Sequence, residues 1–171
     1  ERIVLREAMR RVFGSEHLPS FDLGNAQFLL NFGAEFLNDW ISPVHLSIGY
    51  GAFRAEAGGK RGRYWHVGPQ LSATAANADK WVYINPGTEG LVALSMAQVM
   101  TSQGLVDQGA ASSIYNGITL DDYTPDKVAD KAGISADQIT ELAKTFASAK
   151  PAIAMAGTSA AAHTNGLFNL T

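Results

Sequence analysis

The chain has no cysteine among its 171 residues, which excludes disulfides, thiolate zinc sites and cysteine-held iron–sulfur clusters within it. It also has no excess of basic residues, since 13 Lys and Arg stand against 16 Asp and Glu. Nucleic-acid binders usually carry a clear basic excess, so we predict no nucleic-acid partner. No apolar run approaches the ~18 residues that a membrane helix needs, so we expect no direct membrane insertion by this segment.

What the chain does contain is typical of a folded domain. Hydrophobic residues make up 46% and charged residues 17%, which excludes a disordered protein. The sequence begins at Glu1, without an initiator Met or a signal peptide, and the segments 2–13 and 160–170 at its two ends resemble helices without closing signals. We therefore expect residues 1–171 to form one α/β domain or part of one, as a fragment of a longer chain.

Four short apolar runs predict buried strands, each ended by Gly or by Asn and Pro: residues 27–32, 64–67, 81–84 and 152–156. None alternates between apolar and polar residues, which favours a sheet covered on both faces. Helices are expected over 91–100, 125–131 and 135–148, the last with a capping box formed by Ser135 and Gln138. This order predicts a layered α/β fold with a mostly parallel sheet and helices on both faces.

Motifs for common chemistries are missing. The sequence has no P-loop, no Gly-x-Ser-x-Gly, no His-Glu-x-x-His and no Gly-x-Gly-x-x-Gly after a strand. Its histidines have no spacing typical of a metal site, so we interpret each as structural or exposed: His17, His45, His66 and His163. We predict no catalytic residue and no metal ligand in this segment.

Glycine and proline recur where the predicted strands end, at 33–35, 68–70, 86–89 and 157–159. In open α/β sheets, ligands bind outside the carboxyl ends of the strands, and glycine lets backbone N–H groups approach a phosphate. Taken alone, this pattern is typical both of a nucleotide site and of ordinary turns in such folds.

Three segments resemble the molybdopterin-dinucleotide oxidoreductases. The run ADKWVYINPGTEG at 78–90, followed by LVALSMA at 91–97, is similar to the family's strand that ends in Pro-Gly-Thr-Asp and enters a helix of small residues. Residues 32–44 resemble the family's earlier strand exit, and residues 149–166 resemble its later strand, loop and helix. The resemblance extends over 21–170, except near 104–123, and is greatest to the cofactor-free large iron–sulfur subunit of alternative complex III.

The chain departs from that family where the dinucleotide would lie. Dinucleotide-holding members usually have Gly-x-Asn in place of Gly33-Ala34-Glu35, Asp-Pro-Arg in place of Gly68-Pro69-Gln70, and Asp in place of Glu89. An ionised carboxylate at Glu35 donates no hydrogen bond and repels a pyrophosphate by about 1–4 kcal/mol at 4 Å. The missing Arg removes a forked, permanently charged donor. We therefore predict an unoccupied, vestigial dinucleotide pocket with these candidate residues: Gly33, Glu35, Gly68, Gln70, Thr88 and Glu89.

The resemblance implies a structural role in a membrane-bound quinol:electron-acceptor oxidoreductase of photosynthetic or respiratory electron transport. It implies no cofactor in this segment, with iron–sulfur clusters and haems elsewhere in the complex. The implied partners are haem-bearing and integral membrane subunits, and the implied location is the periplasmic side of a bacterial membrane. The basic loop 60–63 and the acidic stretch 121–130 are candidate contact surfaces.

Two alternatives remain open from the sequence. The segment could belong to an active molybdenum or tungsten bis-dinucleotide oxidoreductase, such as a polysulfide or thiosulfate reductase relative. Its metal ligand would then lie outside this segment. The other alternative is an unrelated α/β binding module without a redox role.

Overall fold

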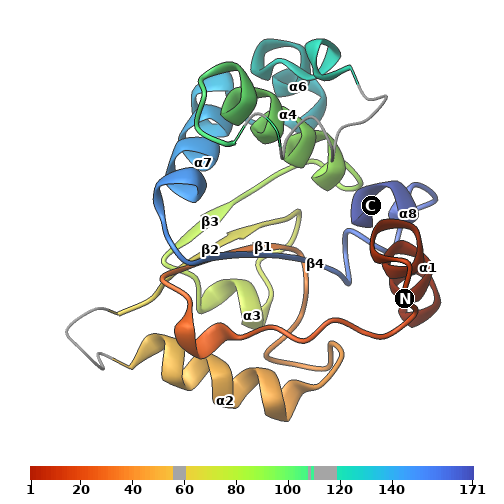
Figure 1. Ribbon diagram of the computed structural model, residues 1–171, viewed down its shortest axis with the longest axis vertical. Coiled ribbons are helices and arrows are strands. Elements are labelled where there is room, and N and C mark those ends of the chain that lie inside the picture. Colours follow the sequence, from red (N-terminus) through yellow and green to blue (C-terminus); the bar gives the residue numbers. More distant parts are fainter. Residues whose placement is uncertain (56–60, 108, 110–118) are drawn as a thin grey trace.

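A parallel sheet forms the centre of the molecule. The computed structural model describes residues 1–55, 61–107, 109 and 119–171. Within them, β1 (Phe28–Phe32), β2 (Arg63–Val67), β3 (Lys80–Val82) and β4 (Ala152–Ala156) pair in the order β3-β2-β1-β4, all parallel (Figure 1). The register places Leu30 opposite both Trp65 and Ala154. The four strands and the parallel sheet are confirmed, but β3 ends at Val82, two residues before the predicted end, and in β4 only Met155 is buried.

Helices cover both faces of this sheet, as predicted. In Figure 1, α2 (Pro43–Arg54) and α3 (Ala73–Ala76) lie on one face, and α4 (Glu89–Ser102), α6 (Pro125–Ala132) and α7 (Ala136–Ser148) lie on the other. Every residue of β1 is buried. Phe28, Leu30 and Phe32 pack with the α4–α7 side, whereas Leu29 packs with the α2 side. This double burial explains why the strand has no polar alternation.

The remaining elements lie at the edges. The helix α1 (Arg2–Phe13) packs beside α8 (Gly166–Leu170), where Figure 1 shows the two termini near each other. Two short 3-10 turns, η1 (Leu23–Asn25) and η2 (Leu120–Tyr123), precede β1 and α6. Within the described residues, no helix has the length and apolar character needed to cross a bilayer.

The capping box of α7 is present. The Ser135 hydroxyl accepts from the Gln138 backbone N–H at 3.2 Å, and the Gln138 side-chain oxygen accepts from the Ser135 N–H at 3.1 Å. These two bonds satisfy N–H groups that the first helical turn leaves without partners.

Two helix predictions need correction. Residues 160–165 form turns, so the helix predicted over 160–170 begins only at Gly166. A Cβ at Gly166 would lie 2.3 Å from the Ala161 carbonyl oxygen, which shows how tightly the chain folds back there. The helix α4 begins at Glu89, two residues before the predicted start. The sequence interpretation also missed α2 altogether.

Asp79 fixes α2 to the sheet. Its carboxylate accepts hydrogen bonds from the Arg54 guanidinium at 2.6 and 2.8 Å and from the Tyr64 backbone N–H at 2.7 Å. Desolvation raises the pKa of Asp79, but the bonds from Arg54 and Tyr64 outweigh it and leave the pKa below its usual value. One side chain thus joins α2, β2 and the start of β3.

Replacing Asp79 tests this joint. We expect Asp79→Ala to lower the free energy of unfolding by about 2 kcal/mol, because Arg54 and the Tyr64 N–H both lose their acceptor. Urea unfolding followed by circular dichroism measures the change. The matched control is Asp130→Ala, which removes an exposed carboxylate and should change stability by less than about 0.5 kcal/mol. Equal effects of the two substitutions would contradict the assignment.

Candidate functional site

The order of the strands reverses beside β1. The chain passes from β1 to β2 and β3 on one side, then crosses through α4, α6 and α7 to place β4 on the other side of β1. Crevices that bind ligands in open α/β sheets lie at this kind of reversal, outside the carboxyl ends of the strands. Here those ends lead into residues 33–35 and 157–159.

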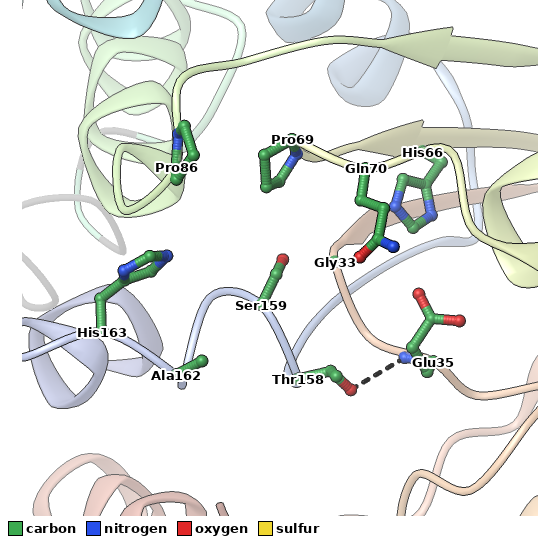
Figure 2. A pocket seen from close by; sticks show the side chains of 10 residues that line it. All are labelled: Gly33, Glu35, His66, Pro69, Gln70, Pro86, Thr158, Ser159, Ala162 and His163. Carbon is green, nitrogen blue, oxygen red and sulfur yellow. Dashed lines mark hydrogen bonds between the residues drawn. The ribbon is translucent and has the colours of Figure 1, made fainter.

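A cavity of about 600 Å³ opens at this position. We call it the exit cavity. Figure 2 shows the residues that line it: Gly33, Glu35, His66, Pro69, Gln70, Pro86, Thr158, Ser159, Ala162 and His163. They come from all four strand exits and from the loop before α8.

The structure brings together only part of the predicted pocket. Gly33, Glu35 and Gln70 line the exit cavity. Gly68 adjoins it, since a Cβ there would lie 3.7 Å from the Gly33 Cα.

The other two predicted residues lie behind the cavity wall. The Thr88 hydroxyl donates to the Asn85 carbonyl at 2.6 Å. Glu89 is only 1% exposed and accepts a bond from the Ser159 hydroxyl at 3.2 Å. Neither lines the exit cavity.

The floor of the cavity is fixed by a buried polar network. Asn31 holds the turn after β1, because its amide donates to the Ala34 carbonyl at 2.7 Å and its oxygen accepts from the Ala34 N–H at 2.9 Å. The Tyr64 hydroxyl lies 2.9 Å from Nδ1 of His66 and 3.3 Å from the Thr74 carbonyl. Burial raises the pKa of Tyr64, so this hydroxyl keeps its proton.

His66 is the one histidine of this network and is only 1% exposed. Burial lowers its pKa to about 4, so its ring is neutral at pH 7. The Asn31 amide nitrogen, which can only donate, lies 3.2 Å from Nδ1, and we therefore assign Nδ1 as the acceptor and the ring proton to Nε2. A Cβ at Gly68 would lie 3.1 Å from that Nε2, which places this N–H beside the cavity. The buried, hydrogen-bonded position of His66 agrees with its interpretation as a structural histidine, and its ring also forms part of the cavity lining.

Three of the backbone N–H groups that could hold a phosphate already have partners. The Glu35 N–H donates to the Thr158 hydroxyl at 3.1 Å, as the dashed line in Figure 2 shows. The Gly157 N–H donates to the Phe32 carbonyl at 3.3 Å, and the Ser159 N–H donates to the Gly33 carbonyl at 3.4 Å. Two further lining residues, Pro69 and Pro86, have no N–H at all.

Side chains also occupy the space beside Gly33 and the start of α4. A Cβ at Gly33 would lie 1.8 Å from Oγ of Ser159, so the serine hydroxyl fills the volume next to this glycine. The Asn169 side-chain oxygen accepts from the Gly90 N–H, in the first turn of α4, at 3.2 Å. Among the residues that the structure describes, no Lys or Arg lines the cavity, whereas Glu35 does. The residues present therefore do not fit a pyrophosphate at this position.

Metal binding finds no support in the geometry either. Across the part of the chain that the structure describes, no group of three His, Asp or Glu side chains is placed to hold a metal ion. The sequence prediction that this segment holds no metal ligand stays a prediction.

The candidate contact surfaces are partly engaged within the chain. Arg61 lies 3.4 Å from Asp79, and the Arg63 guanidinium lies 5.4 Å from the centre of the Phe28 ring. Lys60 falls outside the described residues. In the acidic stretch, Asp122 forms an exposed pair with Lys127 at 3.5 Å. Their role as contact surfaces stays a prediction.

No family model matches this chain. It is 28% identical over 146 residues to the menaquinone reductase molybdopterin-binding-like subunit of Nitratidesulfovibrio vulgaris, covering 85% of this chain and 21% of that protein. It is 27% identical over 161 residues to the molybdopterin-containing subunit of the arsenate respiratory reductase of Shewanella sp., covering 78% and 18%. Among solved structures, acetylene hydratase from Pelobacter acetylenicus has a TM-score of 0.73 and 22% identity, covering 99% of this chain and 23% of that one.

The chain is thus similar to oxidoreductase subunits, among them one described as molybdopterin-binding-like and one described as molybdopterin-containing. These matches support the superfamily predicted from residues 78–90, and the likeness to acetylene hydratase shows the fold. An unrelated α/β binding module is not supported. The chain spans about a fifth of the length of the curated relatives it matches.

His66 predicts a specific pH dependence of stability. Between pH 6.5 and about 4 the unfolded chain binds a proton at this residue and the folded protein does not. The free energy of unfolding should therefore fall as the pH falls through this range, by up to about 3 kcal/mol from His66 alone. Urea unfolding at several pH values measures it.

The matched variants are His66→Gln, which should remove this part of the slope, and His45→Gln, which replaces an exposed histidine and should leave it unchanged. A slope that is the same in the wild type and in His66→Gln would refute the neutral, buried state.

Proposed function

We propose that this chain is a structural, cofactor-free molybdopterin-oxidoreductase-like segment of a membrane-bound quinol:electron-acceptor oxidoreductase of the alternative complex III type. It serves photosynthetic or respiratory electron transport on the periplasmic side of a bacterial membrane. Its partners are haem-bearing and integral membrane subunits, and the iron–sulfur clusters and haems lie elsewhere in the complex. The segment itself carries no catalytic residue.

One observation carries this proposal: the loops after β1 and β4 close on each other. The Ser159 hydroxyl fills the space beside Gly33, and the Glu35 N–H is bonded to Thr158. A phosphate placed there would find N–H groups that already donate to other acceptors, and the Glu35 carboxylate would repel it. The relative named a menaquinone reductase molybdopterin-binding-like subunit supports a quinone-linked complex.

A scaffold must be rigid at the strand exits, where a bound cofactor would otherwise hold the loops together. Here the chain supplies that connection from its own side chains. Asn169 on α8 accepts from the Gly90 N–H and donates to the Ala160 carbonyl at 2.9 Å, which links α4, α8 and the loop after β4. Such a layer can hold electron carriers of neighbouring subunits at fixed separations.

The alternative is a fragment of an active molybdenum or tungsten bis-dinucleotide oxidoreductase. Relatives such as the arsenate respiratory reductase and dimethyl sulfoxide reductase subunits favour it. So does the cavity of about 600 Å³, which persists at the strand reversal.

Elemental analysis separates the two proposals. We expect the intact protein, purified with its partner subunits from membranes, to contain far less than one molybdenum or tungsten per chain and to release no fluorescent pterin on oxidation. The molybdopterin-containing subunit of the arsenate respiratory reductase of Shewanella sp., purified in parallel, is the positive control. A stoichiometric metal would establish the alternative instead.

A further inference from the structure

The residues that line the exit cavity do not fit an anion, but they include polar groups that could bind a ligand of another kind. Its one carboxylate, Glu35, is half-buried and forms no ion pair among the described residues. In Figure 2 this carboxylate points to the side of the cavity where Gln70 and His66 lie. The unpaired group is thus available to a ligand that enters the cavity.

Two further carboxylates border the loop after β4. Glu89 accepts from the Ser159 hydroxyl, directly behind the cavity wall. Glu1 accepts from the Thr158 backbone N–H at 2.5 Å. With Glu35 they place three acidic side chains around residues 157–159, and no Lys or Arg in the described ranges lines the cavity. Same-sign charges around a cleft give it a potential that attracts the opposite sign.

The cavity also holds one neutral donor. Nε2–H of His66 lies beside Gly68 in the cavity lining, and no hydrogen bond from it is found in the described part of the chain. Nε2 is not one of the fully buried polar atoms without a partner, so it reaches the cavity and can donate to a carbonyl oxygen bound there. The site therefore combines an unpaired anion with a donor for a neutral acceptor.

We propose that the exit cavity is a socket for a basic side chain, Arg or Lys, of an adjoining protein subunit. Glu35 pairs with the cation, and Nε2–H of His66 donates to a backbone carbonyl of the same segment. A volume of about 600 Å³ exceeds one guanidinium and admits the backbone on either side of it. A metal cation is disfavoured, because the described residues offer no set of three ligands.

This inference rests on the scaffold function proposed above and specifies how the scaffold holds a partner. In this proposal the exit cavity is a contact site for a neighbouring subunit. It favours a positively charged group, whereas a dinucleotide site favours a negatively charged one. A basic segment of a neighbouring subunit is then favoured, and an acidic or phosphorylated one is rejected.

A titration with a small probe tests the socket in the full chain. Isothermal titration with N-acetyl-arginine amide should show saturable binding, and its neutral isostere N-acetyl-citrulline amide should bind about tenfold more weakly. Glu35→Gln should weaken binding of the arginine probe by about tenfold as well. The control Asp39→Asn removes an exposed carboxylate four residues away and should change the affinity less than about twofold.

A second measurement uses only the wild-type chain, so it still tests the socket if a variant does not fold. The side-chain Nε2 resonance of His66 in the wild-type chain should shift along the same binding curve as the heat. Equal binding of the two probes, equal loss in Asp39→Asn, or saturable binding of inorganic pyrophosphate would each overturn the socket.

The two proposals fail in different ways. Stoichiometric molybdenum or tungsten in the intact protein would refute the scaffold function. A metal-free protein that shows no arginine-probe binding would refute the socket alone.

Discussion

The hydrogen bonding between β1 and β4 continues beyond the ends of the two strands, and the rest of the site depends on this continuation. The Gly157 and Ser159 N–H groups donate to the Phe32 and Gly33 carbonyls, so two loops that diverge around a ligand in other open sheets remain joined here. The contact is close enough to require glycine, since any Cβ at Gly33 would overlap the Ser159 hydroxyl. Because the two loops are joined, their backbone N–H groups already donate to acceptors within the chain. The same junction buries Glu89 behind Ser159 and shapes the exit cavity.

The central strands were predictable because their burial leaves a plain signal. The apolar run at 27–32 has no polar alternation, and the structure buries every residue of β1 on a sheet covered by helices on both faces. The α7 cap was equally predictable, since Ser135 and Gln138 act over one helical turn and need no distant partner. The helix α2 was not. Two glycines interrupt it, and Val44 and Ile48 are exposed at 73% and 71%, so its apolar residues do not form one stripe.

Only part of the site could be predicted, because local sequence patterns mark turns but not the contacts between distant segments. Glycines and prolines at strand ends mark where the chain turns, which was enough to place Gly33, Glu35 and Gln70 at the cavity. The sequence does not tell which neighbour a loop contacts, however. His66 became a cavity donor only through Asn31, a partner on the neighbouring strand that fixes its tautomer. Glu89 was expected to line the vestigial pocket, yet it lies behind Ser159, because Ser159 and Asn169 reach it from positions 70 and 80 residues further along the chain.

The serine beside Gly33 has a consequence for any redesign of this crevice. A phosphate beside Gly33 would require removal of the Ser159 side chain, a neutral residue in place of Glu35 and a cation in place of Gln70. Each change alone leaves the other two obstacles in place. An engineered anion site here therefore needs all three substitutions together.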